Sequence, residues 1–116
     1  KAAIELVGRI KSFKRKILLL GDMLELGKTS TKLHQGLKDV IIRSRIDEVY
    51  TVGSKMKHLY EKFDRTNLLA MHFTKREVLK SYIKYLNFND SVILVKGSRG
   101  MRMEEFVSEI KNKSMS

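Results

Sequence analysis

Short apolar runs alternate with longer amphipathic stretches along this chain, and that alternation limits the possible folds more than any other feature. Each run has the length and aliphatic character of a strand buried on both faces, whereas the stretches between them repeat apolar residues at helical spacing. This pattern predicts an α/β fold: a Rossmann-like three-layer sandwich, with a mostly parallel sheet and helices on both of its faces. Strands are predicted at residues 16–20, 48–52, 68–73 and 91–95.

The helical stretches predict which side chains pack against the sheet. Helices are expected at residues 2–12 and 30–45, and after each of the last three strands. Apolar residues at helical spacing predict the buried face of the helix at 30–45, formed by Leu33, Leu37, Val40 and Ile41. In the helix after the third strand they predict a buried stripe of Val78, Leu79, Tyr82, Ile83 and Leu86.

Two helix starts are suggested by polar residues. Ser54 is a residue type that caps helices, and it precedes the apolar stripe after the second strand. Thr74 and Glu77 have the spacing of a capping box at the start of the next helix.

The length of 116 residues is typical of a single domain, residues 1–116. The absence of cysteine excludes disulfides and thiolate metal sites. The apolar run at residues 17–20 is too short to span a bilayer, and no signal peptide is recognisable, so a cytoplasmic protein without a membrane partner is expected. Because helical spacing starts with the first residues, we expect the chain to be part of a longer protein.

The chain carries a formal charge of +11 at pH 7, which is compatible with binding to nucleic acid. Lysines outnumber arginines, however, and basic residues are spread through every predicted element. Base recognition favours arginine forks instead. A solvated lysine-rich surface is therefore favoured, and a stand-alone basic Rossmann-like module that binds nucleic acid is the alternative.

The loops that follow the strands are the expected ligand-binding region, because parallel sheets bind ligands at the carboxyl ends of their strands. The loop at 96–100 combines two glycines with Lys96, Ser98 and Arg99. The glycines would let the backbone turn sharply and approach a ligand, and the arginine can hold a carboxylate with two parallel bonds. A plain strand-to-helix turn decorated with basic residues is the alternative.

The loop at residues 21–27 carries the carboxylates of Asp22 and Glu25 between hydrophobic side chains. These carboxylates could receive an ammonium group, although they would repel phosphate unless Mg²⁺ intervened. The simpler interpretation is a tight turn whose apolar residues cover the end of the sheet.

Several catalytic motifs are missing from the sequence. It contains neither a glycine-rich dinucleotide fingerprint after the first strand nor a phosphate-binding P-loop. His34, His58 and His72 are far apart and lack the spacing of a metal site, so they are interpreted as structural or surface histidines. A small complete enzyme with its own nucleotide site is therefore not favoured.

Two longer stretches resemble the C-terminal domain of the Mur ligases that add a dipeptide to a nucleotide-linked precursor. Residues 16–27 read KILLLGDMLELG and residues 95–104 read VKGSRGMRME, both similar to motifs of that domain. Leu33–His34 and Val52–Gly53 also match at the expected separations. The resemblance covers nearly the whole chain in order.

The resemblance implies a three-domain cytoplasmic ligase of peptidoglycan synthesis. Its substrates would be UDP-MurNAc-tripeptide and D-alanyl-D-alanine. ATP and Mg²⁺ would bind mainly to a central ATPase domain outside this chain, because the P-loop and the family's nucleotide-holding Asn-Pro motif are missing here. The present domain would close over the active site and bind the dipeptide through Lys96, Ser98, Arg99 and Asp22. It would not be catalytic alone, and no specific nucleic acid is implied as a partner.

Overall fold

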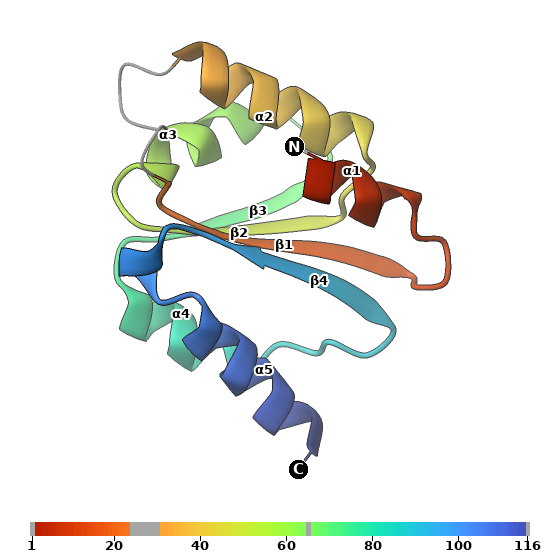
Figure 1. Ribbon diagram of the computed structural model, residues 1–116, viewed down its shortest axis with the longest axis vertical. Helices are drawn as coiled ribbons and strands as arrows, with labels where there is room; N and C mark the ends of the chain where they lie inside the picture. The colour runs from red at the N-terminus through yellow and green to blue at the C-terminus, as the bar shows by residue number, and fades with distance from the viewer. Residues whose placement is uncertain (1, 24–30, 65, 116) are drawn as a thin grey trace.

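The computed structural model describes residues 2–23, 31–64 and 66–115 of the chain (Figure 1). Helices and strands alternate along it, with two 3-10 turns, η1 and η2. The order is α1 (Ala2–Arg9), β1 (Arg15–Gly21), α2 (Thr31–Arg43), β2 (Glu48–Val52), α3 (Met56–Tyr60), η1 (Glu61–Phe63), β3 (Leu69–Phe73), α4 (Arg76–Ile83), β4 (Ser91–Lys96), η2 (Arg99–Met101) and α5 (Glu104–Met115).

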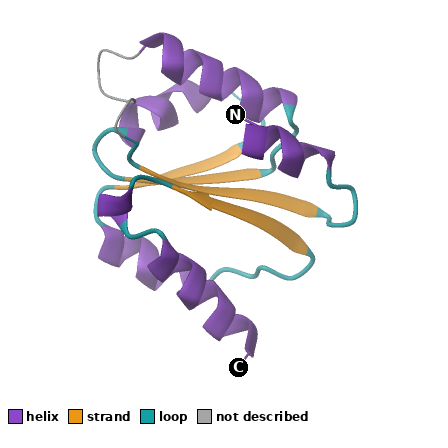
Figure 2. Ribbon diagram, in the orientation of Figure 1, coloured by secondary structure: helices purple, strands orange, loops and turns teal. Residues whose placement is uncertain are grey.

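The four strands form one sheet in the order β3-β2-β1-β4, and every neighbouring pair is parallel. Helices α1, α2 and α3 cover one face of the sheet, and α4 and α5 cover the other (Figure 2). The predicted α/β three-layer sandwich is therefore confirmed. Within the described residues no helix is long and apolar enough to cross a membrane.

Successive side chains of β1 point to opposite faces of the sheet, so the core consists of two clusters. Leu18 and Leu20 pack with α1, α2 and α3, whereas Ile17 and Leu19 pack with α4 and α5. All four side chains are at most 3% exposed. A strand between two helical layers has no solvent face, which explains its unbroken aliphatic sequence.

The predicted buried faces of α2 and α4 are confirmed except for one residue in each helix. Leu33 is 42% exposed, whereas His34 is only 2% exposed. The buried side of α2 turns toward α3 at this point, since the rings of His34 and His58 lie 5.8 Å apart. Val78 is 54% exposed because it lies beside the stripe of α4, whose buried residues include Leu79.

Both predicted caps are also wrong. The helices start one residue later than expected, so Lys55 and Lys75 occupy the N-cap positions and neither makes a side-chain cap hydrogen bond. Ser54 and Thr74 are therefore too early in the chain to cap. In α3 the backbone N–H of Met56 is instead satisfied by a side chain from another loop, as described below.

Candidate functional site

The carboxyl ends of the four strands lie together, toward the left of Figure 1. We call this region the rim; in the described residues it comprises Gly21–Met23, Gly53–Lys55, Thr74–Lys75 and Lys96–Met101. Backbone hydrogen bonds join its loops. The N–H of Ser98 donates to the carbonyl of Asp22 (2.8 Å), and the N–H of Gly53 donates to that of Phe73 (3.0 Å).

Asp22 ties the rim together with its side chain as well. Its Oδ1 accepts a hydrogen bond from the backbone N–H of Met56 (2.9 Å), so it caps α3 from a distance of 34 residues along the chain. The carboxylate also lies against Gly53, where an added Cβ would come within 2.5 Å of it. Glu25, the other carboxylate predicted in this loop, lies outside the described residues.

The end of β4 packs unusually close to the end of β1. A Cβ on Gly97 would lie 3.2 Å from the Cα of Gly21 and 2.7 Å from the Cγ of Met103. Gly97 is therefore required by close packing, whereas Gly100 faces open space with nothing within 4 Å of an added Cβ. Neither glycine has a positive φ, so the chain turns here without a conformation reserved for glycine, and close packing explains Gly97 instead.

Beyond Gly97 the chain forms the 3-10 turn η2, which contains Arg99 and has Ser98 at its N-cap, whereas Lys96 is the last residue of β4. The N–H of Met101 donates to the carbonyl of Ser98, and that of Arg102 donates to the carbonyl of Arg99 (both 3.0 Å). Lys96 and Arg99 are exposed. Their side chains form no ion pair or hydrogen bond with any residue that the structure describes. No described carboxylate therefore neutralises either cation.

The four predicted binding residues all lie on the rim, and two of them are in direct contact. The backbones of Asp22 and Ser98 share a hydrogen bond, while Lys96 and Arg99 flank Ser98 on the same loop. Whether the four contact a substrate stays a prediction.

Arg76 is a residue of this region that the sequence analysis missed. It starts α4, directly after the rim loop that follows β3, and its Nη1 donates to the carbonyl of Met101. Its Nη2 pairs with Glu105 (2.6 Å), and its guanidinium lies 4.6 Å from the ring centre of Phe106. No local pattern distinguishes this arginine from other basic helix residues, because its partners are at least 25 residues away in sequence.

His72 contacts neighbouring side chains of the fold. His72 shares a hydrogen bond with the hydroxyl of Thr51 (2.8 Å) and stacks on Tyr60. Burial and, secondarily, the charge of Lys57 lower the pKa of His72. In the part of the chain that the structure describes, no three His, Cys, Asp or Glu side chains gather as they would around a metal ion.

Two further groups with shifted pKa values, Glu48 and Tyr50, lie on β2. Glu48 begins β2 and accepts hydrogen bonds from Arg15 (2.6 Å) and from the hydroxyl of Tyr50 (2.6 Å). Burial alone would raise the pKa of Glu48, but these hydrogen bonds outweigh it and lower the pKa. Burial, followed by the contact with Glu48, raises the pKa of Tyr50. We interpret this network as a structural ion pair, since it is far from the rim.

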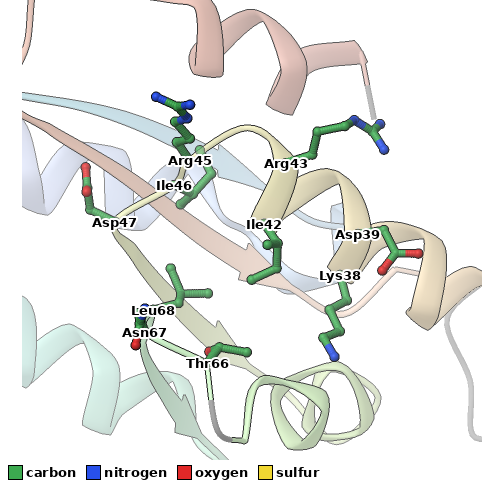
Figure 3. Close-up of a pocket in the computed structure, with 10 residues that line it drawn as sticks. All are labelled: Lys38, Asp39, Ile42, Arg43, Arg45, Ile46, Asp47, Thr66, Asn67 and Leu68. Atoms are coloured by element: carbon green, nitrogen blue, oxygen red, sulfur yellow. The ribbon is translucent and has the colours of Figure 1, made fainter.

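A hollow of about 760 Å³ also lies at the amino ends of the strands (Figure 3). Its walls come from the end of α2 and from the segments that lead into β2 and β3. Its lining includes the aliphatic side chains of Ile42 and Leu68 and charged groups of both signs. Asp39 already accepts a hydrogen bond from the side chain of Gln35, and Asp47 accepts one from the backbone N–H of Lys16. None of the four predicted binding residues lines it.

Comparison with known proteins identifies the family. Residues 1–99 match the family model described as Mur ligase, glutamate ligase domain. The chain belongs to this Mur ligase family. The resemblance inferred from the two signature stretches is thereby confirmed, and the nucleic-acid-binding alternative gains no support.

Named relatives of this Mur ligase domain are much longer than the chain. It is 36% identical to the UDP-N-acetylmuramoyl-tripeptide–D-alanyl-D-alanine ligase of Bacillus subtilis, over 95% of the chain but 24% of the relative. The ligase of the same name from Rickettsia prowazekii is 34% identical, over 92% of the chain and 23% of the relative. The chain thus spans about a quarter of the length of these curated relatives.

A solved structure confirms the fold of this Mur ligase domain. The MurF ligase of Thermotoga maritima, crystallised with ADP, superposes with a TM-score of 0.69 over 96% of the chain and 24% of that protein, at 20% identity. At this identity the likeness supports the fold and not the roles of individual residues.

Proposed function

We propose that this domain is the C-terminal part of an ATP-dependent ligase that joins D-alanyl-D-alanine to UDP-MurNAc-tripeptide in peptidoglycan synthesis. The family match supports the ligase class, and the names of the relatives in Bacillus subtilis and Rickettsia prowazekii support the substrates. We expect the enzyme to act in the cytoplasm.

The domain's own contribution would be to hold the incoming dipeptide. A dipeptide carboxylate that leaves water needs charged hydrogen-bond partners to offset its desolvation. The observation that carries this proposal is the pair of exposed cations, Lys96 and Arg99, on a rim loop that backbone hydrogen bonds hold in place. Arg99 and Ser98 would anchor the carboxylate, and Lys96 would support the loop or contact the reacting groups. Asp22 would contribute mainly by holding the rim loops in place, because one of its carboxylate oxygens already caps α3.

We expect ATP and Mg²⁺ to bind mainly outside this domain. Magnesium requires several oxygen ligands, and the described residues offer no cluster of three carboxylates or histidines. The chain also has no P-loop to surround phosphates. We therefore assign phosphate transfer to the central ATPase domain of the complete protein. Closure of the present domain onto it would bring the dipeptide to the activated carboxylate.

Kinetics of the complete ligase test the dipeptide assignment. Arg99→Ala should raise the KM for dipeptide roughly 30- to 150-fold, the equivalent of about 2–3 kcal/mol for a hydrogen bond to a charged group. Arg99→Lys should restore only part of the affinity, because an ammonium cannot reproduce the guanidinium fork. The KM for ATP should change little.

Lys111→Ala is the matched control, since Lys111 is an exposed cation on α5 away from the rim. It should leave both KM values unchanged. If Arg99→Ala raises the KM for ATP and spares that for dipeptide, the rim loop has been assigned to the wrong substrate.

A further inference from the structure

We infer that Arg76 is a positioning residue for the dipeptide carboxylate, which it serves by holding η2 and thereby Arg99 in place. This inference rests on the proposed function. Arg76 lies on α4, after β3, whereas η2 follows β4. A single side chain therefore couples two rim loops that the sheet order β3-β2-β1-β4 places on opposite edge strands.

The guanidinium of Arg76 makes three different contacts at the end of η2. It donates to the carbonyl of Met101, pairs with Glu105 (2.6 Å) and lies over the ring of Phe106 (4.6 Å). The side chain is only 17% exposed. A planar, delocalised cation with several donors can satisfy all three partners at once, which a lysine ammonium cannot.

These contacts complete the restraint of the loop that carries Arg99. At its start, the N–H of Ser98 is held by the carbonyl of Asp22. At its end, Arg76 holds the carbonyl of Met101, next to Arg102, whose backbone is left-handed with φ of 46°. A non-glycine residue in that conformation is strained and needs support from its surroundings. Arg99 lies between the two fixed points.

The folding of α4 against α5 does not depend on Arg76 alone. Leu79 and Ile83 of α4 and Phe106 of α5 are buried in the same apolar cluster. A second ion pair, Lys80 with Glu109 (3.7 Å), joins the two helices farther from the rim. Loss of the Arg76 contacts should therefore loosen η2 while the helices remain packed.

The test uses the complete ligase with Arg76→Met, which keeps an apolar stem of similar length but removes the charge and the donors. We expect the KM for dipeptide to rise roughly 5- to 20-fold, since displacing a binding group by about 1 Å is sufficient for losses of this order. The kcat and the KM for ATP should stay within twofold of the parent enzyme. Arg76→Lys should show a smaller rise because it keeps the charge near Glu105. Lys80→Met, which removes the other α4–α5 ion pair, is the control and should leave the dipeptide KM unchanged.

A double-mutant cycle separates positioning from a general structural role. If Arg76 acts through Arg99, adding Arg76→Met to Arg99→Ala should leave the dipeptide KM of the single Arg99 variant unchanged. Additive effects, or an equal rise with Lys80→Met, would overturn the inference. So would a normal dipeptide KM in Arg76→Met when Arg99→Ala is impaired, and in that case the proposed function stands. If Arg99→Ala itself binds dipeptide normally, the proposed function fails, and the positioning role fails with it.

Should Arg76→Met not fold, Arg76→Lys and Glu105→Gln, which weakens the same ion pair, are compared by the same cycle.

Discussion

Gly53 is the position where the rim should be most sensitive to a single methyl group. Its φ is +109°, a backbone conformation that L side chains rarely adopt. A Cβ added there would lie 2.5 Å from the Cγ and Oδ1 of Asp22 and 2.6 Å from its Oδ2. These distances are far below van der Waals contact, so Gly53→Ala must displace the carboxylate that caps α3.

The expected loss of stability combines three effects. Forcing an alanine into this backbone region costs about 1–3 kcal/mol. Displacing Asp22 from the N–H of Met56 removes a charged hydrogen bond, worth about 1 kcal/mol here because Asp22 is only partly buried. The reduced freedom of the unfolded chain returns about 0.4–1 kcal/mol. We therefore expect a net destabilisation of about 1–3.5 kcal/mol, or a melting temperature lower by roughly 4–14 °C.

Urea denaturation and thermal melting of the 116-residue chain measure this effect, with Gly100→Ala as the control. Gly100 is also a rim glycine, but its added Cβ meets nothing within 4 Å and its φ is not positive. The control should change stability by no more than about 0.5 kcal/mol. Gly53→Ala in an Asp22→Ala background isolates the backbone strain from the clash. The reasoning is refuted if the two glycine variants are equally stable.

The remaining predictions concern charge, backbone strain and chemistry. Because the pKa of Glu48 is lowered in the fold, its contribution to stability is present above the ordinary value of 4.5 and is lost as the pH falls through the folded value. Glu48→Gln should therefore be less stable than the parent at pH 7, and the difference should shrink in denaturation experiments below pH 4.5; a constant difference would contradict this. Arg45 has a left-handed backbone (φ 56°) after α2, where hydrogen bonds from Arg45 to Ile42 and from Ile46 to Ile41 form a Schellman-type end. Arg45→Gly should raise the unfolding free energy by about 0.5–1 kcal/mol, the left-handed strain less the entropy that glycine loses; a destabilised variant would show that the arginine side chain has contacts of greater value. The chain alone should release no phosphate from ATP with Mg²⁺, UDP-MurNAc-tripeptide and D-alanyl-D-alanine, and release above a buffer blank would mean that it holds a nucleotide site of its own.

The strands could be predicted from sequence because strands between two helical layers contain short, mostly apolar runs, which differ from the amphipathic helical stretches around them. The predicted strand at residues 48–52 matches β2, and the other three agree with β1, β3 and β4 within one residue at each end. The side of a helix that is buried was harder to predict. Leu33 and His34 are neighbours, and only the position of α3 decides that the histidine is the buried one.

The ties within the candidate site could not be predicted, because they join residues that are distant in sequence. Asp22 was singled out as a possible substrate ligand, but no sequence pattern indicates that its carboxylate caps a helix 34 residues later. Gly97 was explained by conformational freedom, whereas the structure explains it by the closeness of Gly21 and Met103. Both features depend on which strands are neighbours in the sheet, and only the folded structure supplies that order.

The rim separates the residues that hold its loops from those that would bind a ligand. Each tie has a backbone group as a partner: the carbonyl of Asp22 with Ser98, its carboxylate with the N–H of Met56, and Arg76 with the carbonyl of Met101. The cations of Lys96 and Arg99 take no part in these ties. A binding group whose side chain is not needed for the fold can be directed entirely at a ligand, while the backbone beneath it is held rigid. It follows that substitutions at Asp22 or Gly53 should alter stability and binding together, whereas substitutions at Arg99 should alter binding alone.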